Sequence, residues 1–92
     1  MHAIIPPKRR GIELSHVPHE LAEEFPDKVD RLHELKTSHA HFARLFDEYH
    51  LINREIHRIE SGIEPSSDER STDLRKQRLF LKDEIAAMLS RD

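Results

Sequence analysis

Seven apolar residues in the middle of this chain follow one another at alternating steps of three and four. They are Phe42, Leu45, Tyr49, Ile52, Ile56, Ile59 and Ile63. An average apolar spacing of about 3.5 residues is typical of a helix that packs lengthwise against another helix. The stripe therefore predicts a long helix over residues 39–61 and a second helix that pairs with it.

The second helix is expected after a short break. Gly62 is placed to end the first helix in the left-handed conformation, and Pro65 prevents its easy continuation. Ser66 and Glu69 then form a capping-box pattern, which predicts a last helix over residues 67–89. Because so few residues join these two long helices, the helices must run antiparallel.

Apolar residues bring the two helices into one register. In that register Ile59 faces Leu74, Ile52 faces Leu81, Tyr49 faces Ile85 and Leu45 faces Met88. Only Ile56 lacks an apolar partner, and we expect Arg78 to lay its methylene groups on it while its charge stays outward. The predicted seam consists of Phe42, Leu45, Tyr49, Ile52, Ile56, Ile59, Leu74, Leu81, Ile85 and Met88.

The N-terminal part of the chain is organised differently. Proline and glycine interrupt residues 1–18, which we predict to be a flexible tail. Residues 19–90 form the predicted domain, with a helical turn over 19–24 and a helix over 26–36 that begins at Pro26, where the missing N–H costs nothing. The predicted fold class is all-α: an antiparallel two-helix coiled-coil hairpin with a shorter N-terminal helix.

The composition excludes several kinds of chemistry. The chain has no cysteine, so disulfides, thiol catalysis and cysteine-ligated metal centres are ruled out. Secreted proteins of this size usually depend on disulfides, and we therefore expect a cytoplasmic location. Hydrophobic and charged residues each make up 36% of the chain, which suits a narrow seam better than a thick core. No apolar run is long enough to span a membrane.

No residues have the spacing of a complete catalytic or metal site. His16 with His19, if that segment is helical, or His57 with Glu60 could supply two ligands, which are too few for a closed site. His39 and His41 would point in different directions on a helix, whereas His50 and His57 would lie about 10 Å apart along it, so neither pair can chelate one ion. Catalytic triads and nucleotide-binding motifs are absent from the sequence. A thin hairpin also lacks the concave volume of an active site. We therefore expect no enzymatic activity, no cofactor and no metal.

Apolar residues off the seam predict a surface for another molecule. The residues Phe46, Leu51, Leu79, Phe80 and Leu89 widen the apolar face beyond what two helices cover. Either the N-terminal helix folds back over the open end of the hairpin, or two copies form a four-helix assembly. Phe46, Leu79, Phe80 and Leu89 are the candidate partner surface. The predicted function is a non-enzymatic interaction or adaptor module that self-associates or binds a protein partner.

An alternative function is weak, nucleic-acid-associated regulation. It depends on a basic cluster, Lys8 to Arg10, and on the basic positions Arg70, Arg75, Lys76, Arg78 and Lys82 of the last helix. The net charge of −3 and the acidic residues between those positions argue against a nucleic-acid partner.

The sequence also resembles a known family. The residues that carry the resemblance are Glu34-Leu35-Lys36-Thr37-Ser38, His41-Phe42, Leu45, Glu48-Tyr49, Asn53, Ile56 and Arg58-Ile59-Glu60, with Glu24-Phe25-Pro26 upstream and Arg78-Leu79 and Leu81-Lys82-Asp83-Glu84 downstream. Over about residues 19–90 they resemble the YdcH-like family of small bacterial proteins, a domain of unknown function. The resemblance implies a helical hairpin with a shorter N-terminal helix in a Gram-negative cytoplasm, and it implies no catalytic residues.

The chain departs from that family at the start of the long helix. Ser38 is the expected N-cap, but His39 follows it where the family tends to have Asp or Asn. A carboxylate would favour the positive end of the helix dipole, whereas a protonated imidazole would oppose it. We therefore expect low pH to weaken the start of this helix.

Overall fold

The structure is a computed structural model, and it describes residues 17–91. All regular elements in this range are helical: α2 (Leu21–Glu24), the 3-10 turn η1 (Pro26–Lys28), α3 (Val29–Ser38), α4 (Ala40–Glu60) and α5 (Asp68–Leu89). The all-α prediction is confirmed, and residues 17–91 contain no strand. The predicted tail lies outside the described residues except for its last two. No helix in this range is both long enough and apolar enough to cross a membrane.

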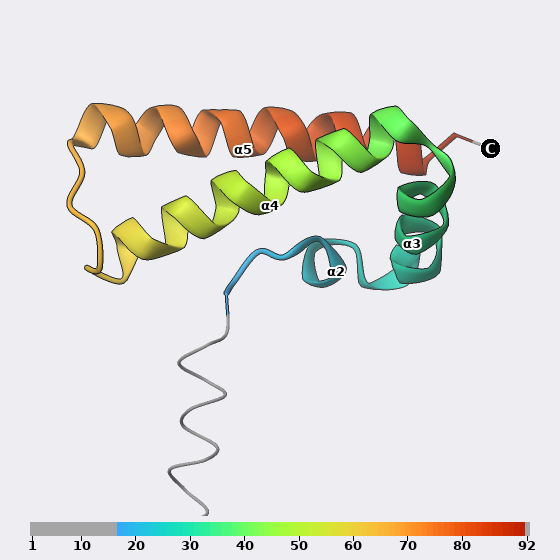
Figure 1. The fold of residues 1–92 in the computed structure, drawn as a ribbon, viewed down its shortest axis with the longest axis horizontal. Helices are drawn as coiled ribbons and strands as arrows, with labels where there is room; N and C mark the ends of the chain where they lie inside the picture. The colour runs from blue at the N-terminus through green and yellow to red at the C-terminus, as the bar shows by residue number, and fades with distance from the viewer. Residues whose placement is uncertain (1–16, 92) are drawn as a thin grey trace, which may run out of the picture.

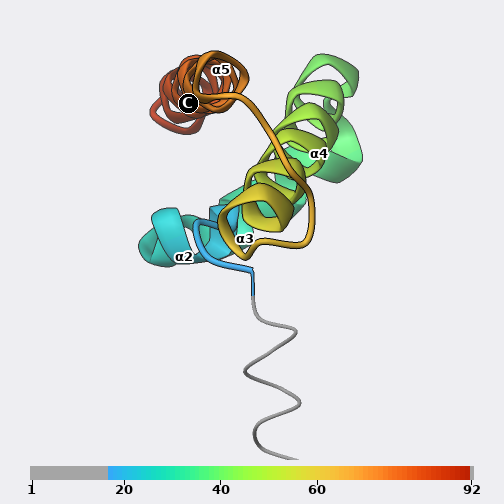
Figure 2. The same cartoon turned by 90° about the vertical axis from the view of Figure 1, so that its left-hand side faces the viewer.

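Helices α4 and α5 form the predicted antiparallel hairpin. The chain colours in Figure 1 run in opposite directions along them, and Figures 1 and 2 both show that their axes are inclined to one another. Several polar contacts link the helices, and two of them indicate the register. Arg78 Nη1 donates to Asn53 Oδ1 at 2.9 Å, and Arg75 Nη2 donates to Glu60 Oε2 at 2.9 Å. Both pairs join positions that nearly face each other in the register predicted from the apolar residues.

The connection between the helices depends on one glycine. Gly62 has a φ of +80°, the left-handed conformation predicted for it. Its N–H donates to the Ile59 carbonyl at 3.1 Å, so the end of α4 is capped. The predicted capping box at α5 is wrong by one residue, because the N-cap is Ser67, whose Oγ accepts from the Arg70 N–H at 3.1 Å. The Ser66 hydroxyl donates instead to the Ser67 carbonyl.

The junction between α3 and α4 also differs from the prediction. Helix α3 continues through Ser38, whose hydroxyl donates back to the Glu34 carbonyl at 2.7 Å and therefore does not cap α4. His39 is the N-cap, and its Nδ1 accepts from the Phe42 N–H at 3.3 Å. The imidazole therefore caps α4 through the lone pair of Nδ1. The weakening of this helix start at low pH stays a prediction.

The main core lies where α2 and α3 meet the open end of the hairpin. Its buried members are Leu21, Leu32, Leu35, Phe42, Leu45, Tyr49, Leu81, Ile85, Met88 and Leu89. Ile56 and Leu74 are buried outside this cluster, whereas Ile52 and Ile59 are half-buried. The predicted seam is therefore largely buried. Of the two uses foreseen for the extra apolar surface, the first is confirmed, because α2 and α3 fold back over the open end (Figure 1).

Two faces of the hairpin as candidate interaction sites

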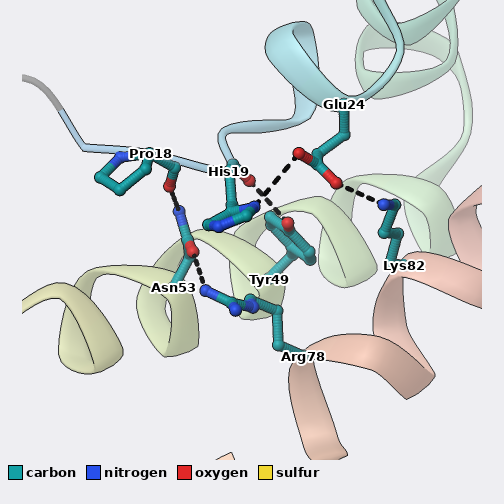
Figure 3. Close-up of polar contacts among 7 residues, drawn as sticks. All are labelled: Pro18, His19, Glu24, Tyr49, Asn53, Arg78 and Lys82. Atoms are coloured by element: carbon teal, nitrogen blue, oxygen red, sulfur yellow. Dashed lines mark hydrogen bonds and ion pairs between the residues drawn. The ribbon is translucent and has the colours of Figure 1, made fainter. Parts of the chain in front are cut away.

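Residues 17–25, which we call the N-terminal segment, lie against one side of the hairpin. Two of its backbone carbonyls accept hydrogen bonds from α4: Tyr49 Oη donates to His19 O at 2.6 Å, and Asn53 Nδ2 donates to Pro18 O at 2.9 Å (Figure 3). Pro18, which the sequence assigned to the flexible tail, is thus part of the folded unit. The hydrogen bond from the Asn53 side chain joins this residue to α4.

Asn53 joins three parts of the chain. Its side chain is buried, with 1% exposed, and its amide donates to Pro18 while its carbonyl oxygen accepts from Arg78. A buried amide is costly unless its polar atoms have partners, and here both ends have one. We expected Arg78 to keep its charge outward, but its guanidinium turns toward α4 and donates to the buried Asn53 side chain. The register of apolar residues did not indicate this partner.

Ion pairs add to these hydrogen bonds. Glu24 pairs with Lys82 of α5, and its second oxygen lies 3.3 Å from His19 Nδ1 (Figure 3). Glu20 Oε1 lies 3.0 Å from Nδ1 of His50 on α4. The bond from Lys82 lowers the pKa of Glu24 below its ordinary value of 4.5, burial opposes the shift, and His19 lowers the pKa further. Lys82 therefore links α5 to the N-terminal segment by an ion pair, and Glu20 lies close to His50 of α4.

Two local features direct these contacts. His19 has a φ of +66°, a left-handed conformation that is rare for a residue with a side chain, and its carbonyl accepts from Tyr49. Burial raises the pKa of Tyr49 to about 12, and the charge of Glu24 adds to the shift. The phenol thus remains a hydrogen-bond donor well above neutral pH.

The other side of the α4–α5 seam is apolar and open. A groove of about 380 Å³ lies there, lined by Glu48, Leu51, Ile52, Gln77, Phe80 and Leu81, and we call it the Phe80 groove. Leu51 is two residues from Tyr49 and Phe80 is two residues from Arg78, so each points about 160° away from its neighbour around the helix. The exposed fractions of Leu51 and Phe80 are 70% and 63%.

The four residues of the predicted partner surface do not form one surface. Phe80 lines the groove, whereas Leu79, also exposed at 59%, lies beside Tyr49 and Arg78 on the opposite side. Phe46 is half-buried against the core, and its ring stacks on that of His50 with 5.9 Å between centroids.

Leu89 is a correction to the prediction. It is 4% exposed and belongs to the core, so it is not a surface residue. Leu89 is buried because the N-terminal third of the chain covers the end of the hairpin where this residue lies. Leu51, which the prediction left out of the partner surface, is the residue that shares the groove with Phe80. The sequence indicated Leu51 only as an apolar residue that lies off the seam.

The basic residues of α5 are mostly engaged within the fold. Arg70 pairs with Glu55, Arg75 with Glu60, and Lys82 with Glu24. These pairs neutralise charge that a nucleic-acid surface would require. The cluster from Lys8 to Arg10 lies outside the described residues. Within residues 17–91, no three side chains of the kinds that bind metals come together.

This architecture defines a class of small helical hairpins with one side closed by an N-terminal segment and the other open. The chain belongs to the family DUF465, described as a protein of unknown function, which matches residues 42–89. The match covers most of α4, the connection and α5. YdcH-like proteins belong to this family, so the resemblance seen in the sequence is confirmed. No match was found among curated proteins or among solved structures.

Proposed function

We propose that this protein is a non-enzymatic interaction module that pairs with a second copy of itself through the Phe80 groove. The observation that carries the proposal is the exposure of Leu51 and Phe80 on one side of the hairpin. Contiguous apolar surface with a polar rim is typical of interaction sites, and here Glu48 and Gln77 supply the rim. On the other side, Tyr49, Asn53 and Lys82 already bind the N-terminal segment.

A second copy fits this face because the face carries both a protruding ring and a hollow. In a two-fold symmetric contact each copy presents the same patch, so Phe80 of one chain packs beside Leu51 of the other and the reverse holds at once. Two hairpins joined in this way form a four-helix arrangement. This is the second use foreseen for the apolar residues off the seam.

The expected association is weak. Fully burying a Leu or Phe side chain contributes about 1.5–3 kcal/mol, so four such side chains give about 6–12 kcal/mol at most. Association costs about 4–15 kcal/mol of lost freedom. The balance predicts an equilibrium between monomer and dimer that depends on protein concentration.

Sedimentation of the full chain over a range of concentrations tests the proposal. We expect the wild type to shift toward dimer as concentration rises and Phe80→Glu to remain monomeric. Leu79→Glu is the matched control, because it makes the same charge change at the neighbouring, similarly exposed residue on the other side. The control should dimerise like the wild type. A wild type that stays monomeric, or equal loss in both variants, would contradict the proposal.

A further inference from the structure

A second hollow lies between the N-terminal segment and α5. It has a volume of about 200 Å³, and its lining includes Glu24, Tyr49, Arg75, Arg78, Leu79 and Lys82. It is on the opposite side of the seam from the Phe80 groove and shares no lining residue with it. The pairing of two copies proposed above makes no use of it.

The lining is rich in positive charge. Arg75, Arg78 and Lys82 follow one another at steps of three and four, which places them on one stripe of α5 about 10 Å long. Like charges at this spacing repel one another. The lining contains a single carboxylate, that of Glu24, and both of its oxygens already face Lys82 and His19.

Arg78 differs from the other two cations. Arg75 pairs with Glu60 and Lys82 pairs with Glu24, whereas Arg78 forms no ion pair within residues 17–91. Its single hydrogen bond is to the neutral amide of Asn53, so most of the five guanidinium N–H donors remain available. Arg78 is half-buried, so an anion in this hollow could bind to its free donors.

We propose that this hollow binds a phosphoryl group, with Arg78 as its main ligand. A guanidinium can hold two phosphate oxygens at once, and a lysine adds an adaptable point charge. A phosphate carries about 1.5–2 negative charges and several acceptor oxygens, so it can use the free donors of Arg78 and also approach Arg75 and Lys82, whose own ion pairs are partly exposed. Because whole-ligand sites usually measure about 300–1,000 Å³, this smaller hollow holds the phosphoryl group alone, and any attached group projects into solvent.

The test is a titration of the full chain, followed by NMR at constant ionic strength, with inorganic phosphate in one arm and glycerol phosphate in the other. We expect saturable shifts of the Arg78 Nε–H signal and of the His19 and Lys82 amides. Saturation by phosphate alone identifies the free ion as the ligand, and tighter binding of glycerol phosphate identifies a monoester. The absence of saturation in both arms, or shifts spread over all basic residues, would overturn the proposal.

Variants sharpen the result. Arg78→Gln should weaken binding by about tenfold or more, since it removes the charged, two-pronged ligand of the phosphoryl group. Lys76→Gln, which removes one charge from the same helix outside the hollow, should bind like the wild type. Circular dichroism checks that Arg78→Gln is folded, because this change also removes a partner of Asn53.

A second pair of variants leaves the Asn53 contact intact. Leu79→Glu places an extra carboxylate in the hollow and should weaken phosphate binding several-fold, whereas Phe80→Glu should leave it unchanged. In the sedimentation experiment the order is reversed: Phe80→Glu should prevent the pairing of two copies, whereas Leu79→Glu should not. Failure of phosphate binding and failure of self-association are therefore distinguishable, and equal phosphate affinity in both variants would contradict this site.

Discussion

The two sides of the α4–α5 seam are made by the same two helices, yet only one of them is covered. On the covered side, Tyr49 and Asn53 present polar atoms that cannot be buried without partners, and the carbonyls of the N-terminal segment supply them. On the open side, Leu51 and Phe80 present no polar atom that requires a partner. Because these side chains need no hydrogen-bond partner, the chain can fold without covering this side, which stays open to a second copy.

The comparison predicts that the same kind of truncation has very different effects on the two sides. Ile85 is fully buried, so Ile85→Ala should lower the free energy of unfolding by about 2–5 kcal/mol. Phe80→Ala should change it by no more than about 0.5 kcal/mol at concentrations where the chain is monomeric. Urea unfolding of both variants measures the difference. Similar losses would show that the Phe80 side is as closed as the core.

Tyr49 provides a test of the covered side in alkali. Its pKa is higher in the folded chain, at about 12, than its ordinary value of 10.0, so its contribution to stability is complete below pH 10 and is lost as pH rises from 10 to 12. A shift of this size corresponds to roughly 3 kcal/mol. Because Tyr49 is the only tyrosine, phenolate absorbance follows this group alone.

The control for the alkaline experiment is Tyr49→Phe. This variant loses the hydrogen bond to His19 but should not lose stability through phenol ionisation in the same pH range. An absorbance midpoint near 10 in the folded wild type would mean that the phenol is open to water.

Asn53→Ala should also weaken the covered side. It leaves the Pro18 carbonyl and the Arg78 guanidinium without their present partner, and we expect a loss of about 1–3 kcal/mol in the free energy of unfolding. Gln77→Ala is the control, since Gln77 is exposed on the open side and should have almost no effect. Equal effects of the two changes in urea would argue against a structural role for Asn53.

The smallest expected effect concerns Glu24. Its pKa is lowered in the folded chain, so its contribution to stability is present above pH 4.5 and is lost as pH falls through the folded pKa. The contribution should be about 1 kcal/mol, because the pair with Lys82 is partly exposed and screened by salt. Unfolding measured across this pH range should show a shallower acid dependence in Glu24→Gln than in the wild type. Identical curves would exclude a contribution from the pair.

The hairpin could be predicted from the sequence because its information is local. The steps of three and four that include Phe42, Tyr49 and Ile56 define a helical stripe, and Gly62 marks the end of α4. Cap positions were less predictable. Serine, aspartate and histidine can each accept the same hydrogen bond, so neighbouring residues compete, as at Ser38 and His39.

The covered side could not be predicted in the same way. The partners of Tyr49 and Asn53 are backbone carbonyls about thirty residues earlier in the chain. Every residue has such a carbonyl, so no residue type marks the contact. The burial of Leu89 was missed for a related reason, since it depends on where the N-terminal third of the chain folds back.

Thiol labelling of two single-cysteine variants tests the central contrast most directly, because the chain has no cysteine of its own. Leu21, at 2% exposed, lies within the N-terminal segment, whereas Phe80 lies on the open side at 63%. In dilute solution we expect Phe80→Cys to react like an unstructured peptide and Leu21→Cys to react at least about tenfold more slowly, since labelling requires the segment to open. Equal rates at the two sites would contradict a hairpin with one covered and one open side.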